Sequence, residues 1–228
     1  MRLAVVVPTL EEEARIGGTL AALAAVPGVA EVVVADGGSR DRTVAVARGF
    51  AGVRVVTAPR GRGTQLNAGA RVAVGDVLLF LHADVSLPPD AVAWVERALA
   101  DPAVVGGGFR TWTVAEGARS WVVPLLHLAD ARSRVARLPY GDQAVFVRRT
   151  AFDAVGGFPE QPLMEDVELA RRLARLGRLV VVPASVVVSG RRFVARPLRS
   201  LVAMRLFPLL YRLGVAPDVL ARLYGDPR

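Results

Sequence analysis

Short hydrophobic runs alternate with amphipathic stretches along the first hundred residues of the chain. The runs are rich in valine and leucine and predict strands, whereas stretches with apolar residues every three or four positions predict helices. The expected strands are 2–7, 31–35, 53–58 and 77–81, and the expected helices are 14–25, 42–50, 65–74 and 91–100. This alternation predicts an α/β, Rossmann-like fold in which helices flank a mainly parallel central sheet.

The pattern becomes less regular after residue 100. Strands are expected at 104–112 and 144–147, and helices at 121–133, 150–155 and 166–176. Residues 179–188 are expected to be extended, with a break at Pro183, because proline cannot donate to a strand ladder. We expect one compact domain with a first half (1–100) and a second half (101–195), followed by a helical amphipathic tail (196–228).

The tail permits two interpretations, because large apolar residues alternate in it with Arg199, Arg205, Arg212 and Arg222. The helix could make peripheral contact with a membrane, where apolar and cationic side chains each find their own solvent. Alternatively, it packs on the domain or on the second subunit of a homodimer, with the arginines extended to solvent. Pro208 and Pro217 are expected to interrupt a long helix, which favours the second interpretation.

Composition limits the chemistry that the chain can use. It has no cysteine, so any metal must be bound by oxygen or imidazole. The net charge of +8 comes from arginine alone, a residue that suits phosphate recognition. No recognition helix, zinc finger or aromatic-basic RNA motif accompanies this charge, so we expect no nucleic-acid partner.

The apolar segments give no sign of export. The apolar run after Arg2 is short and ends at Pro8, which does not resemble a secretory signal. No uncharged apolar run approaches the roughly 20 residues of a membrane span. We therefore expect a cytoplasmic protein, at the inner face of the membrane if the tail makes contact there.

Two aspartates follow expected strands, Asp36 after the second and Asp84 after the fourth. Ligands of open α/β sheets bind at the carboxyl ends of the strands, so these two carboxylates can converge on one crevice. One can hold a nucleotide and the other its metal. An ordinary capped turn would explain Gly37, Ser39 and Asp41, but it leaves Asp36 unexplained.

Four motifs, at residues 5–12, 36–43, 60–62 and 81–84, occur in the order found in family 2 glycosyltransferases, which have the GT-A fold. The chain resembles this family from residue 1 to about residue 195. The resemblance implies metal-dependent, inverting transfer of a sugar from a UDP- or GDP-linked donor to an acceptor hydroxyl. It assigns residues 1–100 to nucleotide-sugar binding and residues 101–195 to acceptor binding and catalysis.

The resemblance also assigns the site residue by residue. The residues implied in nucleotide binding are Pro8, Thr9, Glu11, Asp36, Arg60, Arg62, Gln65, Asn67, His82 and Ala83. Asp84 is the implied ligand of a divalent metal, Mg or Mn. The family has Asp-x-Asp where this chain has His82-Ala83-Asp84, a variant that resembles a small bacterial branch. For His82, three interpretations stay open: support of the metal from behind its ligand, a contact with the nucleotide, and a satisfied histidine at a strand end.

In the second half, the resemblance makes Glu165 and Asp166 the catalytic pair, with Asp166 as general base. A carboxylate at a helix start can also be only a cap. Gln143, Arg191 and Arg192 are implied in acceptor or diphosphate binding. Because one metal-site aspartate is missing, a catalytically inactive nucleotide-binding or membrane-associated partner protein with the same fold is the alternative.

Overall fold

Eight strands form one sheet in the described part of the protein, with the order β3-β2-β1-β4-β7-β6-β8-β5. The computed structural model describes residues 1–115, 122–135, 139–191, 194 and 197–225. The strands are β1 Leu3–Thr9, β2 Val29–Asp36, β3 Val53–Thr57, β4 Val77–Phe80, β5 Val85–Ser86, β6 Val104–Val114, β7 Val145–Arg148 and β8 Arg178–Ser189. Strands β1 to β4 pair in parallel, and β7 is antiparallel to both β4 and β6.

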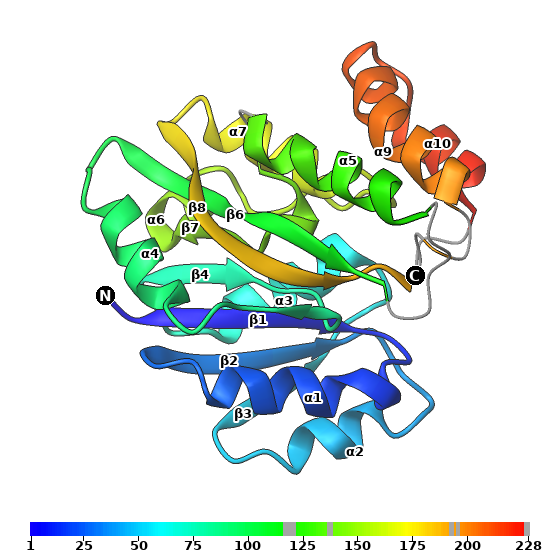
Figure 1. The fold of residues 1–228 in the computed structure, drawn as a ribbon. Coiled ribbons are helices and arrows are strands. Elements are labelled where there is room, and N and C mark those ends of the chain that lie inside the picture. Colours follow the sequence, from blue (N-terminus) through cyan, green and yellow to red (C-terminus); the bar gives the residue numbers. More distant parts are fainter. Residues whose placement is uncertain (116–121, 136–138, 192–193, 195–196, 226–228) are drawn as a thin grey trace.

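Helices cover both faces of this sheet (Figure 1). They are α1 Glu13–Ala24, α2 Thr43–Arg48, α3 Arg62–Val72, α4 Ala91–Leu99, α5 Val122–Val135, the 3-10 helix η1 Gly141–Gln143, α6 Arg149–Ala154, α7 Glu165–Leu173, α9 Pro197–Arg212 and α10 Pro217–Tyr224. Residues of α1 and α4 share one core, and residues of α3, α6 and α7 share the other. The predicted α/β fold with a mainly parallel, helix-flanked sheet is confirmed.

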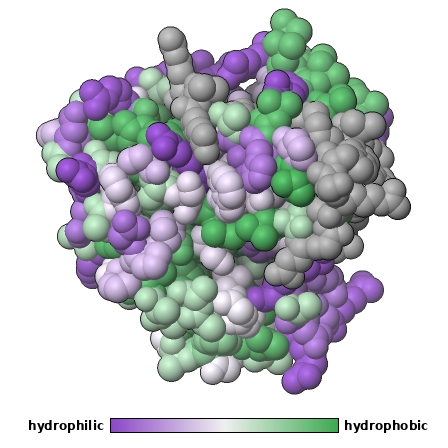
Figure 2. Space-filling model, viewed as in Figure 1, coloured by the Kyte–Doolittle hydropathy of each residue, from purple (hydrophilic) through white to green (hydrophobic). Residues whose placement is uncertain are grey.

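The C-terminal helices α9 and α10 protrude from the domain, and hydrophobic residues gather over them at the upper right of Figure 2. Helix α9 continues through Pro208, so the predicted interruption there is wrong. Pro208 is buried, and its packing offsets the backbone hydrogen bond that proline cannot make. Pro217 does begin a new helix, at a position where a missing N–H costs nothing. Among the described residues, no helix is both long and apolar enough to cross a bilayer.

The break expected at Pro183 is a bulge within a continuous strand. Phe109 of β6 pairs with Val182 of β8, and the next residue, Arg110, pairs with Ser185. Pro183 and Ala184 therefore stand outside the ladder, where the missing N–H of proline leaves no partner unsatisfied. The pairing resumes beyond them, so the prediction of a break is corrected to a bulge.

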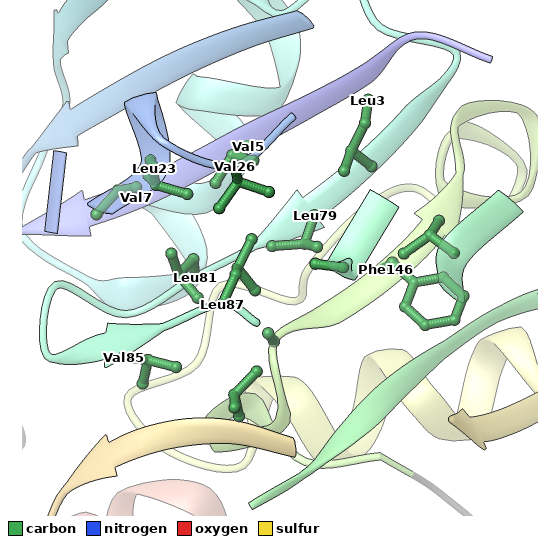
Figure 3. Packing of buried hydrophobic residues seen from close by; sticks show 14 of the residues in the cluster. Leu3, Val5, Val7, Leu23, Val26, Leu79, Leu81, Val85, Leu87 and Phe146 are labelled. Atoms are coloured by element: carbon green, nitrogen blue, oxygen red, sulfur yellow. The ribbon is translucent and has the colours of Figure 1, made fainter. Parts of the chain in front are cut away.

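Strand β1 lies at the centre of the sheet and is buried on both faces. Leu3, Val5 and Val7 belong to the core with α1 and α4, which Figure 3 shows in part. Ala4 and Val6 belong to the core with α3 on the opposite face. Burial on both sides explains why this strand is an unbroken hydrophobic run rather than an alternating one.

Gly69 lets α3 approach β1 closely, and we predict that Gly69→Ala destabilises the protein. A Cβ at this position would overlap Val6, whose side chain is fully buried. We expect a loss of about 1–2 kcal/mol in the free energy of unfolding, measured with urea.

Gly18→Ala is the matched control, because Gly18 lies in the middle of α1 with no atom near an added Cβ. This variant should gain about 0.5–1 kcal/mol from helix propensity. Equal changes at the two positions would contradict the close contact.

Candidate active site

The turn after β2 is organised by the carboxylate of Asp36, which is buried. The Asp36 carboxylate accepts hydrogen bonds from Thr9 Oγ1 (3.1 Å) and Ser39 Oγ (2.6 Å). It also accepts from the backbone N–H groups of Gly38 (2.9 Å) and Ser39 (2.8 Å). A carboxylate can accept about four hydrogen bonds, so these four donors fill the acceptor sites of Asp36. Asp36 therefore shapes the turn, and its contact with a nucleotide stays a prediction.

The loop after β1 is fastened to the same turn. The N–H of Glu11 donates to Ser39 Oγ (2.9 Å), and Glu11 Oε1 accepts from the N–H of Arg40 (2.8 Å). Glu11 has a φ of 54°, which few residues other than glycine adopt. Further along, the N–H of Glu13 donates to Asp41 Oδ2 (3.1 Å). The two loops thus form one connected wall at the carboxyl ends of β1 and β2.

Two amide side chains of α3 hold this helix against its neighbours. Gln65 Nε2 donates to the carbonyl oxygens of Thr9 (2.7 Å) and Ala35 (3.0 Å), at the ends of β1 and β2. Asn67 exchanges two hydrogen bonds with the backbone of Phe158, each of 2.9 Å. These contacts give both amides a structural role, and their predicted nucleotide contacts stay predictions.

Gln143 is fully buried at the end of η1. Its Nε2 donates to the carbonyl of Phe109 (2.8 Å), and its Oε1 accepts from the N–H of Tyr140 (2.9 Å). Both ends of the amide are therefore bound to backbone. Gln143 holds η1 beside β6, and an acceptor contact by this side chain stays a prediction.

Arg62 at the start of α3 forms an ion pair with Glu165 at the start of α7. The Glu165 side chain is 1% exposed and that of Arg62 is 30% exposed. Burial acts to lower the pKa of Arg62, but the carboxylates of Glu165 and Asp166 outweigh it and raise that pKa. The raised pKa favours the charged guanidinium in this ion pair. The pair joins the first half of the chain to the second.

Asp166 lies beside this ion pair, where its carboxylate is fixed by two backbone groups. Oδ2 accepts from the N–H of Gly141 (2.7 Å), and Oδ1 accepts from the N–H of Val167 (2.8 Å). A Cβ on Gly141 would lie 2.9 Å from Asp166 Oδ2 and 3.3 Å from His82 Nε2, so these two side chains meet at Gly141. The tight approach requires glycine.

A pocket opens between these elements, with Arg62, His82, Glu165 and Asp166 in its wall. The structure thus brings together four of the residues predicted for the site. Sequence reasoning missed Gly141 as a site residue, although the Gly141-Asp142-Gln143 motif drew attention to this turn. It also missed the apolar part of the wall, which includes Phe80 and Phe158.

The remaining predicted residues lie at or after the carboxyl ends of strands. Pro8 is half-buried in β1, and the carbonyl of buried Ala83 accepts a hydrogen bond from Thr19 Oγ1 (2.6 Å). Arg60, before α3, and Arg191, after β8, are both exposed. Arg192 lies outside the described residues.

Asp84 lies between β4 and β5 and is half-buried, with its carbonyl bound by the N–H of Ser189 (3.1 Å). In the described part of the chain, its carboxylate has no hydrogen-bond or ion-pair partner. Nor do these residues contain a group of three or more acidic, His or Cys side chains that could hold a metal alone. A carboxylate oxygen suits Mg or Mn when phosphate oxygens and water complete the coordination. Asp84 therefore fits a metal that is shared with a diphosphate.

Residues 4–158 of the chain match the family model for glycosyl transferase family 2. The chain belongs to this family. The matched segment includes Asp36, His82 and Asp84, and it ends before Glu165 and Asp166. The family match alone therefore does not assign the carboxylates at the start of α7.

Solved structures share the GT-A fold over nearly the whole chain. A mannosyltransferase from Pyrobaculum calidifontis, in complex with GDP-Man and Mn²⁺, is 25% identical, with a TM-score of 0.73 over 98% of this chain and 69% of that one. Glucosyl-3-phosphoglycerate synthase from Mycobacterium tuberculosis, with Mn²⁺, UDP and glucosyl-3-phosphoglycerate, is 25% identical, with a TM-score of 0.63 over 94% and 80% of the two chains.

A curated relative is the β-monoglucosyldiacylglycerol synthase of Synechocystis sp., which is 28% identical over 163 residues. The alignment covers 63% of this chain and 33% of the relative. The aligned part of the chain thus corresponds to about a third of that protein.

We predict that the charges of Arg62 and Glu165 are energetically coupled. Arg62→Met leaves the buried Glu165 carboxylate without its cation and should cost about 3–5 kcal/mol of unfolding free energy. The double variant R62M/E165Q removes both charges and should be about 2 kcal/mol more stable than R62M.

Urea unfolding of the single variants R62M and E165Q and of the double variant R62M/E165Q measures this coupling. The exposed pair Arg178–Asp101 (3.0 Å) is the control, and Arg178→Met should cost less than about 1 kcal/mol. Additive effects of the Arg62 and Glu165 substitutions would show that the pair contributes no coupling.

Proposed function

We propose that the protein transfers a sugar from a UDP- or GDP-linked donor to an acceptor hydroxyl, with inversion at the anomeric carbon. The observation that carries the proposal is the meeting of Asp166, His82 and the Arg62–Glu165 pair around one pocket. Membership in glycosyl transferase family 2 supports the reaction class. The donor and metal of the 25% identical neighbours, GDP-Man or UDP with Mn²⁺, support a nucleotide-sugar donor and a divalent cation.

In the proposed reaction, Asp166 is the general base. Its carboxylate accepts the proton of the acceptor hydroxyl while that oxygen forms a bond to the anomeric carbon. The bond from this carbon to the diphosphate oxygen breaks, and the nucleoside diphosphate leaves as an anion. The hydrogen bonds from Gly141 and Val167 hold the carboxylate in one orientation, which is the positioning that general base catalysis needs.

Charge on the leaving diphosphate must be neutralised. Asp84 would hold the divalent metal, Mg or Mn, which supplies electrostatic stabilisation of the leaving group when bound. Arg60 and Arg191 are exposed cations at the ends of β3 and β8 and are proposed to bind the diphosphate. Glu165 pairs with Arg62, so we assign it the positioning of α7 rather than proton transfer.

The acceptor class is suggested by the curated relative. That protein is named as a synthase of β-monoglucosyldiacylglycerol, so a lipid hydroxyl is one candidate acceptor. The alternative function is a catalytically inactive nucleotide-binding protein, which is favoured by the single carboxylate at the metal position. The retention of Asp166 in the pocket favours catalysis instead.

Asp166→Asn should lower turnover by roughly 10²- to 10⁴-fold, because the amide cannot take the proton. Donor binding should be unchanged, since an asparagine oxygen can still accept the Gly141 hydrogen bond. Release of UDP or GDP from the matching sugar nucleotide is the assay, with exposed Asp153→Asn as control. Wild-type turnover in Asp166→Asn would exclude this residue as the base.

Asp84→Asn should weaken the Mn²⁺-dependent binding of UDP or GDP by roughly ten-fold or more, a change within the range that metal-site substitutions produce. Calorimetry with and without Mn²⁺ separates this loss from metal-free binding, which should not change. Metal-independent binding by the wild type would remove Asp84 from the proposal. Nucleotide binding without turnover, on any sugar donor, would favour the inactive alternative.

A further inference from the structure

The outward side of α9 carries an apolar stripe, which we define as Val202, Leu206, Leu209 and Leu213. Their spacing places them within about 60° of arc on one side of a helix that turns about 100° per residue. All four are between 41% and 73% exposed. The N–H of Leu213 donates to the carbonyl of Leu209 (3.0 Å), so the last turn includes Leu213.

The opposite side of α9 is already packed on the domain. Ala203 and Phe207 are buried in a cluster with Leu163 and with Leu220 of α10. The hydroxyl of Tyr211 donates to Glu168 Oε2 (3.2 Å) on α7. These contacts fix α9 on the domain and do not involve the stripe, so the stripe is available to bind a partner.

Helix α10 extends the exposed apolar surface. Val219 and Leu223 lie one turn apart and are 42% and 57% exposed. The two helices form a hairpin through the turn at Gly214, and this hairpin protrudes from the domain (Figures 1 and 2). The protruding shape lets a flat surface reach the stripe.

Charge on the hairpin indicates which partner fits. Arg205 and Arg212 are exposed beside the stripe, and Arg222 is exposed on α10. Asp218 is the only acidic residue between positions 197 and 225. A second copy of the chain would bring two cationic faces together with almost no acid to pair them. An apolar stripe bordered by arginine instead complements anionic lipid headgroups above an apolar interior.

We infer that the α9–α10 hairpin docks on an anionic lipid bilayer, with the stripe in the interface and Arg205 and Arg212 among the headgroups. The inner side of the hairpin contacts Leu163 and Met164, which directly precede Glu165 and Asp166. Docking therefore holds the pocket next to the membrane surface. One consequence, that the acceptor hydroxyl is carried by a lipid, rests on the proposed function. The docking itself does not.

Flotation with vesicles tests the docking without any nucleotide sugar, so its outcome does not depend on glycosyl transfer. The wild type should float with phosphatidylglycerol/phosphatidylcholine vesicles and much less with phosphatidylcholine alone. Leu206→Ser/Leu209→Ser should weaken binding at least roughly ten-fold, through lost apolar burial. Arg205→Gln/Arg212→Gln should weaken it roughly 30-fold on the anionic vesicles, and the wild type should bind less at high salt.

Matched variants elsewhere on the surface are the controls. Val74→Ser/Leu176→Ser removes two apolar side chains that are 57% and 50% exposed, and Arg48→Gln/Arg71→Gln removes two exposed charges. Both should bind like the wild type, and thermal unfolding confirms that every variant is folded.

Three outcomes would overturn the inference. The wild type could fail to float with anionic vesicles, or the stripe and control variants could bind equally. Light scattering could instead show a wild-type dimer that the stripe variant dissociates, which would make the stripe a subunit interface.

Discussion

The ion pair between Arg62 and Glu165 connects the two parts of the chain at the point where the chemistry is expected. Arg62 begins α3, which is fixed to the ends of β1 and β2 by Gln65. Glu165 begins α7, which carries Asp166. A buried carboxylate is costly unless a cation compensates it, so the buried Glu165 of the second half is stabilised by Arg62 of the first half. The ion pair thus links the two parts of the chain that line the pocket.

Much of the fold could be predicted, because the strands of the first half are buried on both faces and appear as continuous hydrophobic runs. The bulge at Pro183 and the continuous helix through Pro208 could not. At Pro183 a bulge leaves the residue outside the ladder, and at Pro208 the helix continues through a buried proline, although local rules treat both residues as stops. The side on which the tail packs could not be predicted either, because it depends on Leu163, which is distant from the tail in sequence.

The candidate site was predicted in part, and its limits have a physical cause. Arg62, His82, Glu165 and Asp166 do meet at one pocket. Gln65 and Asn67 make contacts that a motif cannot reveal, because their partners are backbone groups distant in sequence. Asp36 and Gln143 each add one distant partner, Thr9 Oγ1 and the carbonyl of Phe109. A polar residue in a ligand-binding loop can bind the ligand or stabilise the loop, and only the three-dimensional contacts distinguish the two roles.

The arrangement also bears on how the two adjacent carboxylates divide the roles proposed for them. A single guanidinium near one carboxylate would pair with it and occupy the lone pairs that a base must offer to a proton. Here Glu165 is the buried partner of Arg62, while Asp166 accepts hydrogen bonds from the neutral backbone N–H groups of Gly141 and Val167. Glu165 thus satisfies the cation that orders α7, and Asp166 keeps acceptor capacity on the pocket side. Arg62 can organise the site without taking the place of the acceptor hydroxyl.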